Sequence, residues 1–322
     1  MDSETNLSAA NTNIDSLQTT IPLAPPEFKS GFVAIVGRPN VGKSTLMNHL
    51  IGQKIAITSP VAQTTRNRLR GILTTPEAQI IFVDTPGIHK PHHELGKVLV
   101  QNAKTAIKSV DLVLFVVDSS SEAGTGDRFI FDLLKRIDTP VVLGLNKVDL
   151  QPSNYQFIDD TYADLIAETN WSTVKFSATK GTGTADLQQA LCDRLETGPY
   201  YYPPDLVTDQ PERFIMAELI REQILLHTRQ EIPHSVAITI EKIVEAPKIT
   251  KVNAAINIER SSQKGIIIGK KGSMLKTIGS AARQQIQKLI AGKVHLELFV
   301  KVEPKWRQSR LRLAEFGYQV EE

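Results

Sequence analysis

The chain of 322 residues predicts two domains of different kinds: an α/β domain with a mostly parallel sheet and helices on both faces, and a smaller α+β domain. Three observations indicate this division. Short apolar runs alternate with amphipathic segments through the first 197 residues, an order typical of parallel βαβ units. A proline-rich stretch then ends the alternation. The length also exceeds what a single hydrophobic core usually serves.

The elements of the first domain follow a tail, residues 1–27, whose composition of Asn, Ser, Thr and Pro predicts disorder. The predicted strands are Phe32–Val36, Ile80–Val83, Leu112–Val117, Val141–Leu145 and Val174–Phe176. The predicted helices lie near Ser44–Ile51, Leu95–Ile107, Arg128–Arg136, Phe157–Glu168 and Ala185–Leu195. The run Arg68–Leu73 predicts a further strand at an edge of the sheet. These elements assign residues 28–197 to the first domain.

The second domain begins after a linker at residues 198–210, which contains Pro199, Pro203 and Pro204. Proline can neither continue a helix nor serve in a central strand, so this stretch separates the domains. Residues 211–318 then predict a helix, two strands, a glycine-bearing segment, a helix and a strand. The helices are Phe214–His227 and Met274–Ile290, and the strands are Val236–Val244, Lys251–Ile258 and Val294–Val302.

A glycine-rich loop connects the first predicted strand to the first predicted helix. Its sequence, Gly37-Arg38-Pro39-Asn40-Val41-Gly42-Lys43-Ser44, matches the P-loop pattern in the strand–loop–helix context that confirms the motif. The backbone N–H groups of such a loop face phosphate oxygens, and the helix N-terminus adds its dipole. Lys43 supplies positive charge to the outer phosphates, and the hydroxyl of Ser44 ligates Mg²⁺. The loop, with Thr45 after it, therefore predicts a nucleoside triphosphate site.

Three shorter motifs follow later strands and select the nucleotide. Asp84-Thr85-Pro86-Gly87 offers a carboxylate that can hold Mg²⁺ through water and an N–H group for the γ-phosphate. In Asn146-Lys147-Val148-Asp149, the carboxylate can accept two N–H bonds from guanine, which adenine cannot offer in the same register. Ser177-Ala178 can supply an N–H group to the guanine O6. All these motifs stand at carboxyl ends of strands, where open α/β sheets bind ligands, so the sequence predicts GTP binding and hydrolysis.

The candidate nucleotide-binding residues are Gly37, Arg38, Pro39, Asn40, Val41, Gly42, Lys43, Ser44, Thr45, Asp84, Thr85, Pro86, Gly87, Asn146, Lys147, Asp149, Ser177 and Ala178. These motifs resemble the translation-factor-like class of P-loop GTPases. Asn40 together with Gln63-Thr64-Thr65-Arg66 narrows the resemblance to the bacterial Era group. In that group the threonine pair lies in the first switch, and one hydroxyl completes the Mg²⁺ shell. The resemblance favours Thr65, with Thr64 as the alternative, and thereby implies Mg²⁺ ligands Ser44, Thr65 and Asp84 and catalytic residues Lys43, Thr65 and Gly87.

Ile88 departs from the Ras pattern, which places a water-orienting glutamine at this position. An isoleucine cannot position water by hydrogen bonding, so another group must stabilise the transition state, or turnover is slow. In related GTPases with an Asn in the P-loop, that residue helps to bind K⁺ beside the phosphates. The resemblance therefore implies K⁺ binding by Asn40. The alternative is that its side chain only braces the loop.

The second domain contains a strongly basic stretch. Residues 260–312 carry 13 basic and two acidic side chains, a balance that favours a polyanionic partner such as nucleic acid. Within it, Gly269-Lys270-Lys271-Gly272 forms a GxxG tetrapeptide in an α-β-β-α-α-β order, which resembles a type II KH domain. Such a loop clamps about four nucleotides of single-stranded backbone. The candidate RNA-binding residues are Gly269, Lys270, Lys271 and Gly272, with Ile267 and Ile268 as a wall of the base-binding groove or as core residues.

The domain order over about residues 28–318 extends the resemblance to the Era group over nearly the whole chain. It implies a GTP switch that binds small-subunit ribosomal RNA near its tail end and assists subunit assembly. It also implies a cytoplasmic monomer that can contact the inner face of the membrane peripherally. The alternative is a membrane-associated GTPase in cell-cycle signalling, but lipid docking does not need a GxxG loop. A non-enzymatic RNA-binding protein is disfavoured because Lys43, Ser44 and Asp84 are all present.

Other classes are excluded by simpler features. The longest apolar run, Leu112–Val117, has six residues, whereas a transmembrane helix needs roughly 20. The first residues lack the apolar core of a secretory signal and the arginines of a transit peptide. The chain has a single cysteine, Cys192, so no internal disulfide can form and a reducing compartment is expected.

Overall fold

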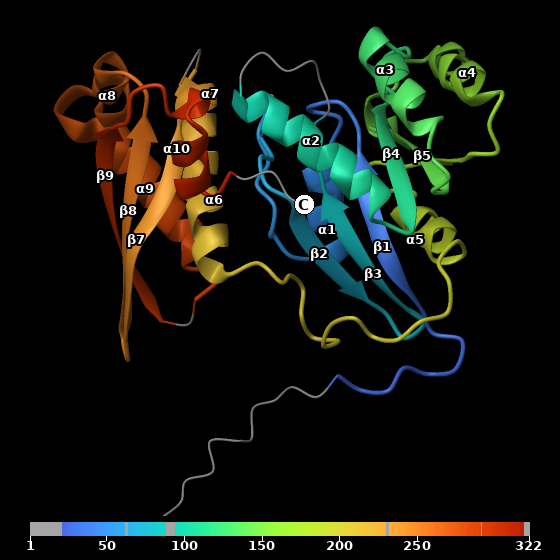
Figure 1. The fold of residues 1–322 in the computed structure, drawn as a ribbon, viewed down its shortest axis with the longest axis horizontal. Coiled ribbons are helices and arrows are strands. Elements are labelled where there is room, and N and C mark those ends of the chain that lie inside the picture. The colour runs from blue at the N-terminus through green and yellow to red at the C-terminus, as the bar shows by residue number, and fades with distance from the viewer. Residues whose placement is uncertain (1–20, 62–63, 88–93, 230–231, 291, 319–322) are drawn as a thin grey trace, which may run out of the picture.

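The computed structural model describes residues 21–61, 64–87, 94–229, 232–290 and 292–318, which form two sheets and their covering helices (Figure 1). Most of the predicted disordered tail, residues 1–20, lies outside the described residues. Among the described residues, no helix has both the length and the apolar character needed to cross a bilayer.

The first sheet has six strands in the order β2-β3-β1-β4-β5-β6. Its strands are β1 (Lys29–Val36), β2 (Leu69–Thr74), β3 (Ala78–Asp84), β4 (Leu112–Asp118), β5 (Val141–Asn146) and β6 (Ser172–Lys175). Its helices are α1 (Lys43–Ile51), α2 (Glu94–Lys108), α3 (Thr125–Leu134), α4 (Tyr155–Ile166) and α5 (Thr184–Cys192), with a 3₁₀ turn, η1, at Val148–Leu150. Every neighbouring pair is parallel except β2 with β3, so the predicted edge strand and the mostly parallel sheet are confirmed.

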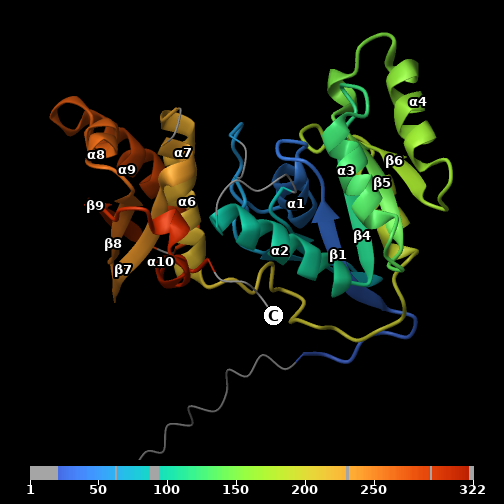
Figure 2. The same ribbon diagram turned by 45° about the horizontal axis from the view of Figure 1, so that its top comes forward.

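Both faces of this sheet are covered, which explains why β3, β4 and β5 are mostly apolar runs rather than alternating ones. In β1, Val33 and Ile35 pack in the core that contains α1 and α5. The residues between them, Ala34 and Val36, pack in the core of α2, α3 and α4 on the other face. Figure 2 shows α1 on one side of the sheet and α2 on the other. The carboxyl ends of β1, β3 and β5 lead into the loops that carry the predicted nucleotide motifs.

The second sheet has three strands in the order β7-β8-β9, with β7 and β8 antiparallel and β8 and β9 parallel. Its strands are β7 (Ala237–Ala246), β8 (Ile249–Ile258) and β9 (Lys293–Val302). Its helices are α6 (Glu212–His227), α7 (Ile232–Ser235), α8 (Ser261–Ile268), α9 (Ser273–Ile286) and α10 (Arg310–Glu315), with 3₁₀ turns η2 (Lys270–Gly272) and η3 (Trp306–Gln308). The glycine-bearing segment thus contains α8, while α7, η3 and α10 were not predicted. Helices α6, α8 and α9 share one core with the sheet.

The two domains are in direct contact, and α6 and α2 both lie along their boundary (Figure 1). Leu95 and Leu99 of α2 share a buried cluster with Trp306, Leu313 and Tyr318 of the second domain. Ile57 of the first domain packs into the core formed by the second domain. The loop that follows α1 is therefore enclosed partly by the second domain.

Candidate functional site

The P-loop, residues 37–44, joins β1 to α1 through close backbone contacts that require glycine. A Cβ on Gly37 would lie 2.2 Å from the carbonyl oxygen of Val116. Gly42 has a φ of +100°, and a Cβ there would lie 2.3 Å from Nδ2 of Asn146. Only a residue without a side chain fits such a path. The loop ends at the N-terminus of α1, where N–H groups without helical partners are suited to bind phosphate.

Lys43 is buried at the start of α1 and is held by the loop itself. Its Nζ donates hydrogen bonds to the carbonyl oxygens of Gly37 (3.0 Å) and Arg38 (2.8 Å). Burial lowers the pKa of Lys43 to about 8, an effect that the nearby Asp84 carboxylate partly opposes. The side chain is therefore positioned inside the loop, and a bound phosphate would favour its charged form.

Three predicted Mg²⁺ ligands converge beside Lys43, although they come from three separate segments. The hydroxyl of Ser44 donates to Oδ2 of Asp84 (2.7 Å), and the hydroxyl of Thr65 donates to the same oxygen (3.0 Å). The two hydroxyl oxygens lie 3.0 Å apart. Oδ1 of Asp84 is buried without a hydrogen-bond partner, and burial raises the pKa of this carboxyl group. A compact set of oxygen donors with an unsatisfied carboxylate oxygen fits a Mg²⁺ ion.

A cavity of about 300 Å³ opens over this cluster. Its lining joins the P-loop to residues on either side of positions 62–63, to Gly87 and to Lys147. The lining residues are Pro39, Asn40, Gly42, Lys43, Ser44, Thr45, Ile57, Thr58, Ser59, Pro60, Thr64, Thr65, Gly87 and Lys147. Residues 57–60 were not predicted to belong to the site, and no residue-type pattern in that stretch indicates it.

Asn146 connects the phosphate side of the site to the base side. Its Nδ2 donates to the Val41 carbonyl oxygen (2.7 Å), and its Oδ1 accepts from the N–H group of Ala178 (2.9 Å). Both ends of the amide are therefore used within the protein. Asn146 holds the P-loop against the loop after β6, a role that its position in the motif did not reveal.

The other residues predicted to contact the guanine base follow Asn146 or lie in the loop after β6. Lys147 adopts a left-handed backbone with a φ of +69° and forms an ion pair with Asp118 (2.6 Å), a partner that the sequence motifs missed. Asp149 is exposed in η1, with its carboxylate accessible to a ligand. Ser177 is buried, and its Oγ accepts from the N–H group of Lys180 (3.0 Å). Asp149, Ser177 and Ala178 are not among the residues that line the 300 Å³ cavity.

Some predicted nucleotide-binding residues direct their side chains into the protein. Arg38 pairs with the fully buried Asp127 of α3 (2.7 Å). The hydroxyl of Thr85 donates to the Ile35 carbonyl oxygen (2.8 Å), and Val41 packs in the core. Thr85 and Val41 can therefore reach a nucleotide only through their backbone, whereas the Arg38 side chain remains 32% exposed. Their side chains fix the loops from behind.

Asn40 contacts the segment that covers the cavity. It has a φ of +64°, and its Nδ2 donates to the carbonyl oxygen of Pro60 (2.7 Å). The bracing interpretation of Asn40 is thus visible in the structure, and the brace extends to the segment before Thr64. Ile88, the basis for expecting another catalytic group, lies outside the described residues.

The GxxG loop forms a tight turn, η2, between α8 and α9. Gly269 and Gly272 have φ values of +71° and +78°, and Lys271 also has a positive φ of 52°. A Cβ on Gly269 would lie 2.7 Å from the Cβ of Met274, whereas the space around Gly272 is open. Lys270 and Lys271 are both exposed. The turn therefore presents two ammonium groups beside an accessible stretch of backbone.

The isoleucines before the turn differ in environment. Ile267 is fully buried in the domain core, Ile268 is half-buried, and Ile266 is 46% exposed. Ile267 can therefore support the groove only from beneath. A separate groove of about 400 Å³ follows α9 and β9, and sequence reasoning did not identify it. Its lining residues are Gly272, Leu275, Lys276, Gly279, Ser280, Arg283, Leu296 and Leu298.

Comparison with known proteins identifies the family of both domains. The 50S ribosome-binding GTPase family matches residues 32–147, and the KH domain family matches residues 231–307. GTPase Era of Crocosphaera subtropica is 72% identical over 313 residues, which cover 97% of this chain and 100% of that protein. The chain belongs to the Era family of GTPases. GTPase Era of a Nostoc species is 69% identical over 324 residues and is matched over the full length of both chains.

Solved structures extend the likeness to both domains. A crystal structure of Era in complex with MgGDPNP and nucleotides 1506–1542 of 16S ribosomal RNA matches with a TM-score of 0.87. Its sequence is 40% identical, and the match covers 90% of this chain and 99% of that one. The predicted resemblance, fold class and GTPase activity are thereby confirmed. This Era-family chain is a GTPase with a C-terminal KH domain.

Proposed function

We propose that this Era-family GTPase binds single-stranded small-subunit ribosomal RNA near its 3′ end and acts as a GTP-dependent switch in assembly of the small subunit. The observation that carries the proposal is the GxxG turn, which exposes Lys270 and Lys271 next to the groove between α9 and β9. The relative that was crystallised with nucleotides 1506–1542 of 16S ribosomal RNA supports this choice of RNA.

On the RNA side, the two lysines neutralise phosphates while the glycines allow the backbone to approach them closely. Leu275, Leu296 and Leu298 give the groove an apolar floor on which bases can pack. Lys276 and Arg283 add positive charge along α9. Ile268 contributes to the wall of the site, and Ile267 supports it from the core.

On the nucleotide side, the N–H groups of the P-loop and the charge of Lys43 bind the phosphates. The exposed carboxylate of Asp149 accepts the N–H groups of guanine, and the 177–178 backbone lies at the O6 edge. Asn146 acts by holding the P-loop against the loop that contains Ser177 and Ala178. Lys147 keeps its strained backbone through the ion pair with Asp118.

Hydrolysis uses the oxygen cluster and the N–H group of Gly87. Ser44, Thr65 and Asp84 would hold Mg²⁺, the carboxylate directly or through water, and the ion would neutralise charge on the β- and γ-phosphate oxygens. The N–H group of Gly87 would contact the γ-phosphate. Asn40 would add a K⁺ site beside the phosphates through its amide oxygen, while Nδ2 donates to the Pro60 carbonyl oxygen.

The division of the chain that accompanies this function is a tail at residues 1–27, a GTPase domain at 28–197, a linker at 198–210 and a KH domain at 211–318. The protein acts as a monomer in the cytoplasm, and its contact with the inner face of the cell membrane is peripheral. Size-exclusion chromatography with light scattering measures the oligomeric state. Cell fractionation at two salt concentrations measures the association with the membrane.

The deciding experiment is crosslinking of the full chain to RNA in cells, followed by sequencing of the attached fragments. Reads concentrated at the 3′ end of small-subunit ribosomal RNA are expected. The Lys270→Ala/Lys271→Ala variant should lose most of this enrichment while it retains GTP binding. Reads spread evenly over abundant RNAs, or equal enrichment in the variant, would contradict the proposal.

A further inference from the structure

Thr65 is flanked on both sides by contacts with the C-terminal domain. The residue after it, Arg66, is only 1% exposed, because its side chain enters that domain. Its guanidinium donates to the carbonyl oxygens of Val236 (2.6 Å) and Pro233 (2.9 Å). The same group lies 6.0 Å from the ring centre of Trp306. The peptide on the C-terminal side of Thr65 is thus anchored outside its own domain.

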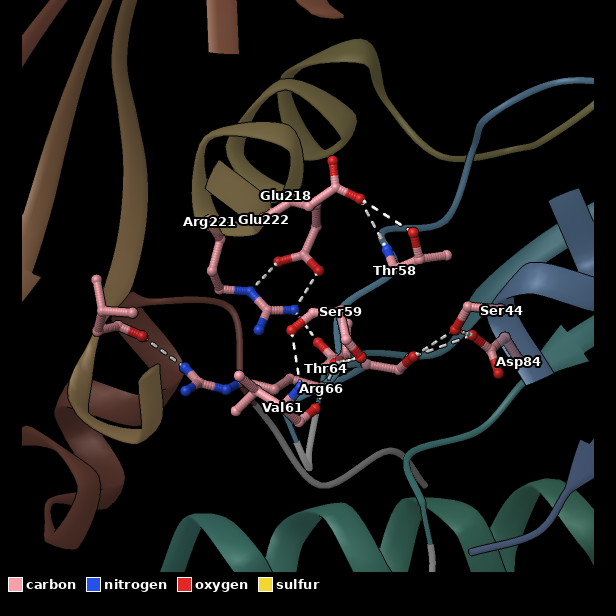
Figure 3. Close-up of polar contacts among 12 residues, drawn as sticks. Ser44, Thr58, Ser59, Val61, Thr64, Arg66, Asp84, Glu218, Arg221 and Glu222 are labelled. Carbon is pink, nitrogen blue, oxygen red and sulfur yellow. Dashed lines mark hydrogen bonds and ion pairs between the residues drawn. The ribbon is translucent and has the colours of Figure 1, made fainter. Parts of the chain in front are cut away.

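The peptide on the other side of Thr65 is held by α6. Arg221 of that helix is fully buried and donates from one terminal nitrogen to the carbonyl oxygen of Thr64. The guanidinium is fixed by Glu218, which accepts from Nε at 2.8 Å and from the terminal nitrogen at 2.5 Å. Figure 3 shows Arg221 between Glu218 and Thr64, with Ser44 and Asp84 beyond them.

The same helix holds the beginning of the segment. Glu222, 1% exposed, accepts from the backbone N–H group of Thr58 (2.8 Å) and from Nζ of Lys54 (2.5 Å). In Figure 3, Glu222 and Arg221 extend from one turn of α6 toward residues 58 and 64. Two neighbouring charged side chains of the RNA-binding domain therefore hold Thr58 and Thr64, which both line the nucleotide cavity.

We propose that Arg66 and Arg221 are positioning residues that place Thr65 beside Ser44 and Asp84, so that completion of the Mg²⁺ site depends on the position of the KH domain. The inference rests on the proposed role of Thr65 as a Mg²⁺ ligand. Thr65 has little freedom of its own, because the peptides before and after it are both fixed by buried arginines. A displacement of α6 would move Thr65 away from Asp84, or would break the buried hydrogen bond from Arg221 to the Thr64 carbonyl oxygen and leave those polar groups unsatisfied, which is costly.

The coupling is reciprocal, because two sites linked through one structural element influence each other equally in binding free energy. GTP with Mg²⁺ favours the arrangement in which Arg66 and Arg221 hold Thr65. A partner that moves the KH domain, such as bound RNA, changes the affinity for GTP without touching the nucleotide. The Arg66 and Arg221 contacts are the element that carries this effect.

The test is a double-mutant cycle in the full chain between Thr65→Ala and Arg221→Met. Methionine keeps the apolar stem of arginine but removes its donors, and Glu218 is 15% exposed, so water can reach its carboxylate. The readouts are kcat for GTP hydrolysis, the Mg²⁺ concentration that gives half-maximal rate, and affinity for GDP. Arg213→Met, at an exposed position on the same helix, is the matched control.

Arg221→Met should lower kcat roughly 10- to 100-fold, the cost of a displacement of about 1 Å in a catalytic group, and raise the Mg²⁺ requirement. In the Thr65→Ala background it should have almost no further effect, because its action passes through Thr65. GDP affinity and the Arg213→Met variant should match wild type. If Arg221→Met does not fold, the same cycle with Arg66→Lys, which keeps the charge but not the paired hydrogen bonds, gives the answer.

The outcomes separate the inference from the function on which it rests. Wild-type hydrolysis and Mg²⁺ dependence in Thr65→Ala would remove the proposed ligand role and the inference with it. An impaired Thr65→Ala with a wild-type-like Arg221→Met would overturn the inference alone. Fully additive losses in the double variant would also overturn it, because Arg221 would then act by a route that does not include Thr65.

Discussion

The sharpest prediction for the RNA-binding half concerns the salt dependence of binding after both loop lysines are removed. Lys270 and Lys271 are exposed on the η2 turn, so Lys270→Ala/Lys271→Ala should not reduce stability. Each lysine that neutralises a phosphate of single-stranded RNA contributes about 0.7 to the slope of log affinity against log salt. Loss of both should make the slope shallower by about 1.4.

That slope has a direct consequence for affinity. When salt rises from 50 to 200 mM, the ratio of wild-type to variant affinity should fall by about 7-fold, which is the fourfold increase in salt raised to the power 1.4. The loss should be similar for different single-stranded sequences, because phosphate contacts carry no sequence information. Lys271→Asp should weaken binding more than alanine, because a carboxylate repels the RNA backbone.

The assay is fluorescence anisotropy with a labelled fragment from the 3′ end of small-subunit ribosomal RNA over a series of KCl concentrations. The matched control is Lys242→Ala/Lys248→Ala, two exposed lysines near the β7–β8 hairpin, at the other end of the sheet from α8 (Figure 1). This control should retain the wild-type slope. An unchanged slope and affinity in the loop variant would show that the GxxG turn is only structural, and the RNA-binding proposal would fail.

The other predictions concern the nucleotide. Asp149→Asn should weaken GTP binding about 10- to 100-fold and favour XTP, because the amide complements the 2-oxo group of xanthine. Competition binding of GTP, ATP and XTP measures this preference, and an unchanged affinity for GTP would contradict it. Lys43→Ala should lower the rate of GTP hydrolysis by roughly 100-fold or more. Phosphate release in a single-turnover experiment measures this rate, and a wild-type rate would refute the P-loop assignment. If Asn40 binds K⁺, turnover should be faster in KCl than in NaCl at matched ionic strength; equal rates would leave Asn40 as a brace only.

The fold was largely predictable because its signals are local. The strands β3, β4 and β5 are buried on both faces, so each is a mostly apolar run that is visible in the sequence. The GxxG turn was visible for a similar reason, since its positive φ values select glycine. Short helices such as α7 and α10 were missed because four to six residues are too few for a periodic pattern to emerge.

The site was predictable where motifs impose residue types and not where backbone atoms are the partners. Arg66 was only a polar residue in a Thr-Thr-Arg triplet, and its partners are the carbonyl oxygens of Val236 and Pro233. Any residue can supply a carbonyl oxygen, so no sequence pattern indicates that contact. The same holds for Asn146, whose amide joins the Val41 carbonyl oxygen to the Ala178 N–H group.

A signal for the contact between the domains was present in α6, although its meaning needed the structure. Glu218, Arg221 and Glu222 are spaced three and four residues apart, so they share one face of a helix. The neighbouring residues Leu219 and Ile220 are also buried, and Glu218 is only 15% exposed, so the middle of this helix is largely shielded from solvent. A largely buried helix that carries three charges on one face must meet polar partners there, because unpaired buried charges are too costly. Those partners are Thr58 and Thr64 of the nucleotide domain, and so the charged face of α6 is where the RNA-binding domain can influence the GTP site.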